Sequence, residues 1–261
     1  MPKNFFALPT AYNGRTTSLV VSGTPVTRPY GLFAEKDDPS NISFKPESKM
    51  DFELEVGVWL SRPVPRGQRL DIAQAKNHIL GLTLLNDWSA RSIQGFEMLP
   101  LGPFNSKSTA TTVSPWIVPI EALEAVKCKR HTEQVPPPPS HLVQWVIEDT
   151  FDVELSAKLI RDGRIYTLCE SNLNVLHWAP AQQLVHLASA GAGLFTGDVF
   201  GTGTISSDRI NADNEKIGLG CLFERDGDEI RLEGWCKDRR SGEILFGFGD
   251  CSGTIVPCLE G

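Results

Sequence analysis

The sequence predicts a mainly β (α+β) fold, built from mixed and antiparallel sheets with a few short helices. Short runs of β-branched and aromatic residues recur along the chain, and Gly, Pro, Asn or Asp separates most of them. Only two or three segments carry helix signatures, and no internal repeat is present. We therefore expect residues 1–261 to form a single sheet-rich domain.

Strand-like segments begin near the N-terminus. Residues 17–21 (TSLVV) are rich in β-branched residues, and residues 52–60 (FELEVGVWL) alternate between apolar and polar side chains. Residues 82–85 are an apolar run with strand composition, and prolines keep residues 112–119 extended. These four segments are the predicted strands of the first half of the chain.

The first helix is predicted directly after Asp71. This residue can cap a helix N-terminus, with Gln74 three positions further on as in a capping box. Ile79 and Leu80 would lie on the apolar side of this helix, and Gly81 would end it.

The second half begins with residues 127–142, whose proline run (VPPPP) predicts a stiff surface excursion. Residues 151–160 and 164–168 flank the dipeptide Asp162-Gly163, which predicts a β-hairpin. A second helix is expected from Pro180 to Gly191. Short strands and glycine turns are expected after residue 197.

Charge and apolar patterning exclude several functional classes. The formal net charge is −7 with no basic block, which disfavours nucleic acid as a partner. The apolar runs are too short for a membrane span, and residues 1–15 lack the pattern of a signal peptide. The six cysteines form no CxxC pair, so we expect reduced thiols and a cytoplasmic location.

Two glutamates in one predicted strand are the first candidate site residues. Glu53 and Glu55 are two positions apart and therefore share a face, while Leu54 and Val56 point into the core. Two such like charges need either solvent or a cation between them. A solvated sheet face and a cation site both remain open on this pattern alone.

Asp87 favours the cation site because it also ends an apolar strand. Three carboxylates suit a hard divalent cation, which predicts Mg²⁺, or else Mn²⁺ or Ca²⁺. Zinc is disfavoured because no His or Cys accompanies the three acids. Arg91 and Lys107 follow on a polar loop and would offset the negative charge.

Other polar residues have ordinary structural explanations. His177 and His186 lie among apolar residues on or near the second helix, which is typical of packing histidines. Residues 201–204 (GTGT) lack the lysine of a phosphate-binding loop and are expected to form a tight turn.

Longer motifs resemble a known family. NDWSAR, at residues 86–91, is followed by PLGPF at 100–104 and by the lysine at 107. PTAYNGR lies upstream, and GTIS and FGFGDCSGTIVP lie downstream. Together these motifs resemble the C-terminal catalytic domain of the fumarylacetoacetase family over nearly the whole chain.

The resemblance implies a β-roll with few helices and a homodimer. It also implies cleavage of carbon–carbon bonds in a small β-diketo or β-keto acid, by hydrolysis or decarboxylation through a metal-stabilised enolate. A non-hydrolytic isomerase or cyclase of a specialised pathway, and a catalytically inactive family member, are the alternative hypotheses.

The resemblance also assigns roles to residues of this sequence. It places the metal ligands at Glu53, Glu55, Asp87 and Thr111. It places the catalytic role at Lys107, which would stabilise the developing enolate, together with Asp87. It places the contacts to substrate at Tyr12, Arg91, Gln94 and Thr204.

The sequence also departs from the family pattern. The family's N-terminal domain, and the following segment with a further metal aspartate and the catalytic histidine, are expected to have no counterpart here. The glutamate that orients that histidine would fall near Leu222, and Glu224 lies two residues further on. Met98 and Asn13 replace a tyrosine and a histidine of the family, which predicts a different substrate pocket.

Overall fold

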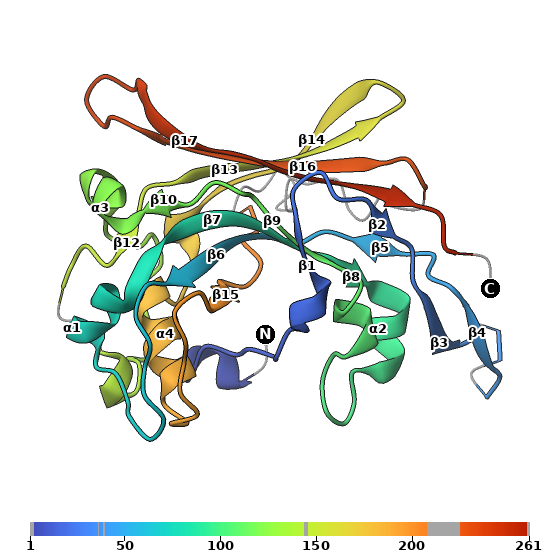
Figure 1. Cartoon of the computed structure of the whole chain (residues 1–261), viewed down its shortest axis with the longest axis horizontal. Coiled ribbons are helices and arrows are strands. Elements are labelled where there is room, and N and C mark those ends of the chain that lie inside the picture. The colour runs from blue at the N-terminus through green and yellow to red at the C-terminus, as the bar shows by residue number, and fades with distance from the viewer. Residues whose placement is uncertain (1–2, 36, 39, 144–145, 208–224, 260–261) are drawn as a thin grey trace.

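The protein is described by a computed structural model that covers residues 3–35, 37–38, 40–143, 146–207 and 225–259. Two sheets form its body (Figure 1). The first runs in the order β1 (Leu19–Val21), β9 (Thr111–Val113), β7 (Ile79–Asp87), β6 (Leu54–Leu60) and β15 (Val199–Gly201), and β10 (Val118–Pro119) also pairs with β7. The second runs in the order β14 (Arg164–Asn172), β13 (Glu154–Arg161), β16 (Glu229–Lys237), β17 (Ile244–Val256) and β2 (Val26–Thr27).

Three two-stranded ribbons and several short helices complete the described fold. The ribbons pair β3 (Tyr30–Ala34) with β4 (Ile42–Pro46), β5 (Met50–Asp51) with β8 (Ser89–Ala90), and β11 (Lys127–Cys128) with β12 (Thr150–Phe151). The α-helices are α1 (Ile72–Ala75), α2 (Arg91–Glu97), α3 (Ile120–Leu123) and α4 (Pro180–Ala188). The 3-10 helices are η1 (Lys3–Phe6), η2 (Thr16–Ser18), η3 (Lys76–His78), η4 (Asn105–Lys107), η5 (Glu124–Val126), η6 (Ser140–Leu142) and η7 (Leu173–Val175). The predicted mainly β fold with mixed sheets is therefore confirmed.

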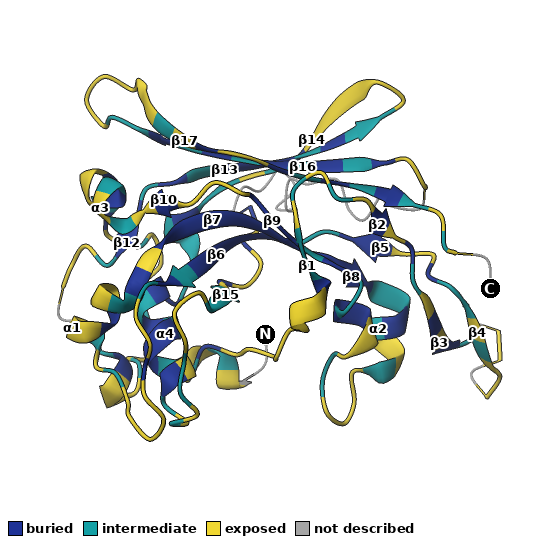
Figure 2. Cartoon of the chain, in the orientation of Figure 1, coloured by how far each residue is buried: buried dark blue, intermediate teal, exposed yellow. Residues whose placement is uncertain are grey.

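The core lies between the two large sheets, with the second sheet crossing above β6 and β7 in Figure 1. The sheets approach closely where β7 crosses β16, because a Cβ added to Gly234 would lie 3.0 Å from Cδ2 of Leu84. Figure 2 shows β6 and β7 buried along most of their length, which explains their nearly continuous apolar sequences. Any polar side chain on these strands is thus held in a dry environment.

The first helix is shorter than predicted. Asp71 does cap α1, since its carboxylate accepts a hydrogen bond from the Gln74 N–H at 2.7 Å. The helical turns end at His78, however, and Ile79 and Leu80 belong to β7. Gly81 does not end a helix but lies inside β7, where a Cβ would meet the Val118 carbonyl oxygen at 2.3 Å. Pairing with β6 and β10 outweighs the local helix pattern here.

The segment after Asp87 also differs from the predicted polar loop, because residues 91–97 form α2. The hairpin prediction is confirmed, since β13 and β14 meet at Asp162 and Gly163, which both have positive φ. The helix predicted from Pro180 is α4. After residue 197, β16 and β17 are longer than the short strands expected.

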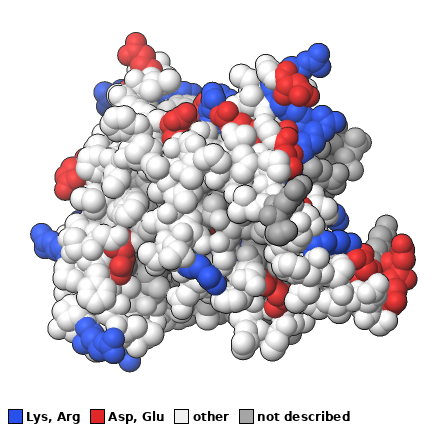
Figure 3. Space-filling view, turned by 45° about the vertical axis from the view of Figure 1, so that its right-hand side comes forward, with Lys and Arg blue, Asp and Glu red and all other residues white. Residues whose placement is uncertain are grey.

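Charged side chains of both signs are interspersed over the face shown in Figure 3. Among the described residues, no helix is both long enough and apolar enough to cross a membrane. Cys128, Cys236, Cys251 and Cys258 are free thiols.

Candidate metal centre

Three carboxylates converge where β6 begins and β7 ends. Glu53 directly precedes β6, Glu55 lies within it, and Asp87 is the last residue of β7. One oxygen from each of the three side chains lies within 4.8 Å of the others. The solvated-face alternative is therefore wrong, because Glu55 and Asp87 are each only 5% exposed.

The sheet itself brings the acids together. β6 and β7 are antiparallel neighbours, with Leu54 opposite Asn86. The Asp87 N–H donates to the Glu53 carbonyl at 3.2 Å, and the Asn86 side chain accepts from the Glu53 N–H at 3.1 Å. Backbone pairing thus fixes both strand ends before any side chain contributes.

Lys107 links two of the three acids. Its Nζ donates to Glu53 Oε2 at 2.6 Å and to Asp87 Oδ2 at 2.7 Å, and its side chain is 4% exposed. Lys107 is the last residue of η4, so this short 3-10 turn places the Lys107 ammonium beside the ends of β6 and β7.

Unlike Glu53 and Asp87, Glu55 is bound by a backbone N–H group and not by Lys107. The Gly203 N–H donates to Glu55 Oε2 at 3.0 Å. Within the described residues, no Lys or Arg forms an ion pair with Glu55. Burial, reinforced by the charges of Asp87 and Glu53, raises the pKa of Glu55 to about 8.

The neighbouring acids respond to the same surroundings. Burial raises the pKa of Asp87, and the Lys107 charge opposes that effect only in part. Burial also acts to raise the pKa of Glu53, but Lys107 and Arg91 outweigh it and hold that pKa below its usual value. The cluster therefore keeps Glu53 ionised and disfavours charge on Glu55.

Gly201 gives Glu55 its space, since a Cβ at this position would lie 2.3 Å from Glu55 Oε2. We expect Gly201→Ala to push the Glu55 carboxylate out of the cluster and to weaken Mg²⁺ or Mn²⁺ binding by about tenfold or more. Isothermal titration calorimetry measures this change. Gly95→Ala serves as the comparison, because a Cβ at this position would meet nothing within 4 Å. Equal affinities for wild type and Gly201→Ala would contradict the expected role.

Two residues predicted to contact substrate, Tyr12 and Arg91, contact the carboxylates, and a third, Gln94, is bonded to Arg91. The Tyr12 hydroxyl donates to Asp87 Oδ2 at 2.6 Å, and burial together with the Asp87 charge raises the pKa of Tyr12. Arg91 NH1 lies 3.0 Å from Glu53 Oε1 and donates to Gln94 Oε1 at 2.9 Å. Arg91 also pairs with Asp51 at 2.7 Å, so its guanidinium is held by protein groups.

The two threonines predicted to belong to the site, Thr111 and Thr204, make no side-chain hydrogen bond to the carboxylates among the described residues. Thr111 of β9 lies opposite Asp87 in the β7–β9 ladder. Thr204 is exposed and directly follows Gly203. Leu222 and Glu224 mark the expected position of the family glutamate that orients the catalytic histidine, and both lie outside the described residues.

The donor set fits a hard divalent cation. Asp87 Oδ2 is occupied by Tyr12 and Lys107, whereas Asp87 Oδ1 is buried and has no hydrogen-bond partner among the described residues. A buried carboxylate oxygen without a partner is costly unless something else binds it. Glu53, Glu55 and Asp87 are therefore the residues that would hold a metal ion.

Sequence reasoning missed the backbone side of this site. Gly201 and Gly203 lie in the GTGT segment, which was predicted to form a tight turn and to supply Thr204 to the substrate, whereas in the structure the two glycines make room for Glu55 and bind it. The two glycines on either side of Thr202 were the only hint in the sequence. The hydrogen bond from Gly203 to Glu55 joins residues 148 positions apart, so no local pattern predicts it. His177 and His186 are half-buried beside or within α4, and neither is part of the carboxylate cluster.

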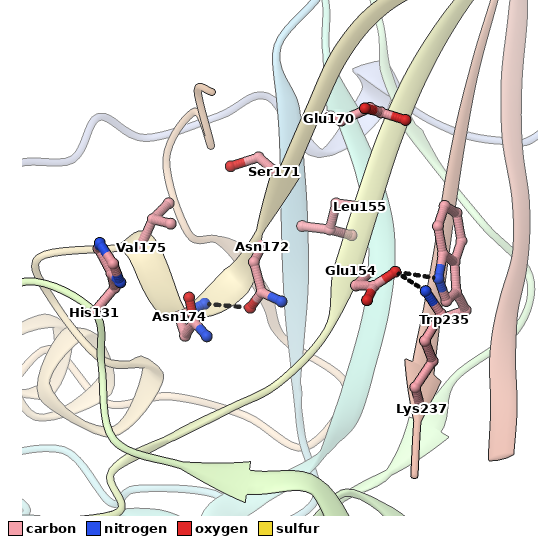
Figure 4. Close-up of a pocket in the computed structure, with 10 residues that line it drawn as sticks. All are labelled: His131, Glu154, Leu155, Glu170, Ser171, Asn172, Asn174, Val175, Trp235 and Lys237. Atoms are coloured by element: carbon pink, nitrogen blue, oxygen red, sulfur yellow. Dashed lines mark hydrogen bonds and ion pairs between the residues drawn. The ribbon is translucent and has the colours of Figure 1, made fainter. Parts of the chain in front are cut away.

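A separate pocket of about 580 Å³ lies along β13, β14 and β16 (Figure 4). None of its lining residues belongs to the carboxylate cluster. Three of its polar groups are paired with one another, since Glu154 accepts from Trp235 Nε1 at 2.6 Å and from Lys237 Nζ at 2.7 Å. We therefore place the candidate chemistry at the carboxylates and not in this pocket.

Comparison with known proteins gives a consistent result. Residues 1–256 match the family model described as fumarylacetoacetate (FAA) hydrolase C-terminal. The chain is 39% identical to fumarylacetoacetase of Dictyostelium discoideum, a match that covers 97% of this chain and 63% of that protein. It is 36% identical to fumarylacetoacetase of Homo sapiens, covering 98% of this chain and 64% of that protein. The chain thus spans less than two thirds of the length of these relatives.

Solved structures share the fold. A fumarylacetoacetate hydrolase from Exiguobacterium antarcticum superposes with a TM-score of 0.56 at 19% identity, covering 94% of this chain and 65% of that one. A 5-carboxymethyl-2-hydroxymuconate delta-isomerase from Mycobacterium smegmatis gives a TM-score of 0.57 at 20% identity, covering 97% of this chain and 72% of that one. Hydrolases and isomerases are thus both found among proteins with this fold.

Proposed function

Because this chain belongs to the fumarylacetoacetate hydrolase family, we propose that it is a divalent-metal-dependent enzyme acting on a β-diketo or β-keto acid. The reaction we propose is cleavage of a carbon–carbon bond, by hydrolysis or decarboxylation, through an enolate of the substrate. The small dicarbonyl acid and the homodimer implied by the resemblance are part of this proposal. The observation that carries it is the cluster of three carboxylates, in which buried Lys107 pairs with Glu53 and Asp87 and one Asp87 oxygen has no hydrogen-bond partner among the described residues.

Breaking a bond to the α-carbon of a dicarbonyl acid leaves negative charge on a carbonyl oxygen. A divalent cation bound by Glu53, Glu55 and Asp87 would act as a Lewis acid toward substrate oxygens. Lys107 Nζ is a fixed donor in a water-poor site, and a donor of this kind stabilises charge as it develops. The Tyr12 hydroxyl, 2.6 Å from Asp87 Oδ2, is a second donor at the same edge of the cluster.

Arg91 and Gln94 would act on the other side of Glu53. Arg91 is held by Asp51 and Glu53, and it fixes the orientation of both Glu53 and Gln94. This arrangement would keep the carboxylates in position while a substrate enters.

A second candidate function is an isomerase or cyclase that works through the same enolate. Lys107 and Tyr12 contact the acids through proton-bearing groups, Arg91 contacts Glu53 through a guanidinium that keeps its proton, and no histidine contacts them within the described residues. Isomerisation needs the stabilised enolate but no activated water, so this pair of groups suits it as well.

The proposal is tested by incubating the protein with oxaloacetate and a series of acylpyruvates, with Mg²⁺ or Mn²⁺ and with EDTA. We expect turnover only with metal, and mass spectrometry separates the two functions because cleavage changes the carbon skeleton whereas isomerisation preserves the mass. We also expect the metal to raise Tm, since it binds only the folded cluster. If neither metal changes Tm and no acid is turned over, the protein is better described as a catalytically inactive family member.

A further inference from the structure

The side chain of Glu97, the last residue of α2, is bound to backbone further along the chain. Its Oε1 accepts from the Phe104 N–H at 2.7 Å and from the Ser106 N–H at 2.8 Å. Its Oε2 accepts from the Asn105 N–H at 3.1 Å. One carboxylate thus binds three consecutive N–H groups at the start of η4.

Glu97 closes a loop that has little packing of its own. Between α2 and η4 the chain exposes Leu99 by 86% and Leu101 by 96%, so these side chains contribute almost nothing to holding the loop. A hydrogen bond from the Gly102 N–H to the Met98 carbonyl, at 2.7 Å, stays within the loop. The carboxylate of Glu97 therefore ties the end of α2 directly to the turn that follows the loop.

That turn carries the buried ammonium of the candidate site. Lys107 ends η4, and its own N–H bonds the Phe104 carbonyl at 3.3 Å. Its Nζ reaches Glu53 and Asp87 at 2.6 and 2.7 Å. Because the Lys107 side chain is buried and meets two carboxylates at once, rotation of the turn would have to distort the stem or break one of these contacts.

We propose that Glu97 is a positioning residue, which holds the η4 turn so that Lys107 Nζ meets Glu53 and Asp87. The proposal rests on the proposed function only in that Lys107 serves the reaction. Both carboxylate oxygens are needed to accept the three N–H groups. Burial acts to raise the pKa of Glu97, but the hydrogen bonds from Ser106, Phe104 and Asn105 outweigh it and lower that pKa, so the acceptor stays ionised.

Two variants test this role, because Glu97→Gln weakens the hydrogen bonding to the η4 turn and Glu97→Ala removes it. Glutamine keeps the size of the side chain but only one accepting oxygen, and its NH₂ group would face an N–H donor. Alanine removes all three hydrogen bonds. Glu35→Gln is the matched control, because Glu35 is also half-buried but pairs with Lys45 at 2.6 Å and is not part of η4.

The position of Lys107 is measured by acylation with an N-hydroxysuccinimide ester, followed by mass spectrometry of the peptide that contains it. In the wild type the amine is buried and paired, so we expect slow labelling. We expect labelling of Lys107 to rise about tenfold in Glu97→Ala and by less in Glu97→Gln, with no change in Glu35→Gln. Cys251, which is fully buried in β17, reports global opening through a thiol reagent in the same samples.

Kinetics on any acid that the wild type converts give the second measurement. We expect kcat to fall about tenfold in Glu97→Gln and further in Glu97→Ala, with KM within about threefold of the wild type, because misplacing a catalytic group acts mainly on the transition state. Labelling that rises equally at Lys107 and Cys251, or that does not rise at Lys107, would overturn the proposal. An unchanged kcat with selectively labelled Lys107 would uphold the positioning role and remove Lys107 from the reaction. Selective labelling in a protein that converts no dicarbonyl acid would leave the positioning role standing and remove the proposed function.

Discussion

A Lys107→Met variant is expected to lose about 10²–10³-fold in kcat, because one preorganised donor to a developing oxyanion contributes on that order. The substitution keeps most of the stem volume and removes only the ammonium, which donates to Glu53 and Asp87. The same change leaves those carboxylates close together without their shared cation. We therefore also expect the metal-free protein to lose about 3–5 kcal/mol of unfolding free energy.

Steady-state kinetics and denaturant unfolding measure the two effects. Lys45→Met is the control, because Lys45 pairs with Glu35 at 2.6 Å but its side chain is 43% exposed. An exposed pair of this kind contributes about 0–1 kcal/mol. A Lys107→Met variant with kcat within threefold of the wild type would remove Lys107 from the mechanism.

Glu55→Gln is expected to stabilise the metal-free protein and to abolish its stabilisation by metal. Without a cation, Glu55 is buried beside two other carboxylates and within the described residues has no ion-pair partner of its own. Its amide analogue carries no charge, and we expect a gain of about 2–4 kcal/mol in unfolding free energy at pH 8.5. With Mg²⁺ or Mn²⁺ the order should reverse, because the variant lacks one anionic ligand. Thermal unfolding of both proteins, with metal and with EDTA, measures this reversal.

The pH dependence gives an independent check on Glu55. Its pKa rises from 4.5 to about 8 on folding, so the folded metal-free protein binds the extra proton between these two values. Stability from this group is fully present below pH 4.5 and is lost as the pH rises toward 8. Glu55→Gln should lack this decline. Metal binding displaces the proton, so affinity should weaken as the pH falls below about 8. Parallel pH profiles of Tm for the two metal-free proteins would contradict this account.

The three carboxylates of the candidate site could be predicted from the sequence because their placement follows local rules of strand geometry. Residues two apart in a strand share a face, which brought Glu53 and Glu55 together, and an apolar strand that ends in Asp87 supplied the third acid. The hairpin at Asp162-Gly163 and the cap at Asp71 were predictable for the same reason.

The missed features depend on contacts distant in sequence. The first turn of α2 has no local cap, and its Ser92 and Ile93 N–H groups donate to the buried carboxylate of Glu47, at separations of 45 and 46 positions. The first helix is short because distant strands recruit Ile79 and Leu80 into β7. No local pattern contains that information.

The arrangement of β7 has a consequence for how the site could change over evolutionary time. Glu55 and Asp87 lie on strands that the core holds on both faces, and Glu53 directly precedes β6, whereas Leu99 and Leu101 belong to a segment with exposed side chains. Substitutions in that segment would cost the fold little, so the loop between α2 and η4 can diversify while the three carboxylates stay fixed. Enzymes with new substrates could then arise from this scaffold by changes at its rim, without a loss of stability that selection would have to repair.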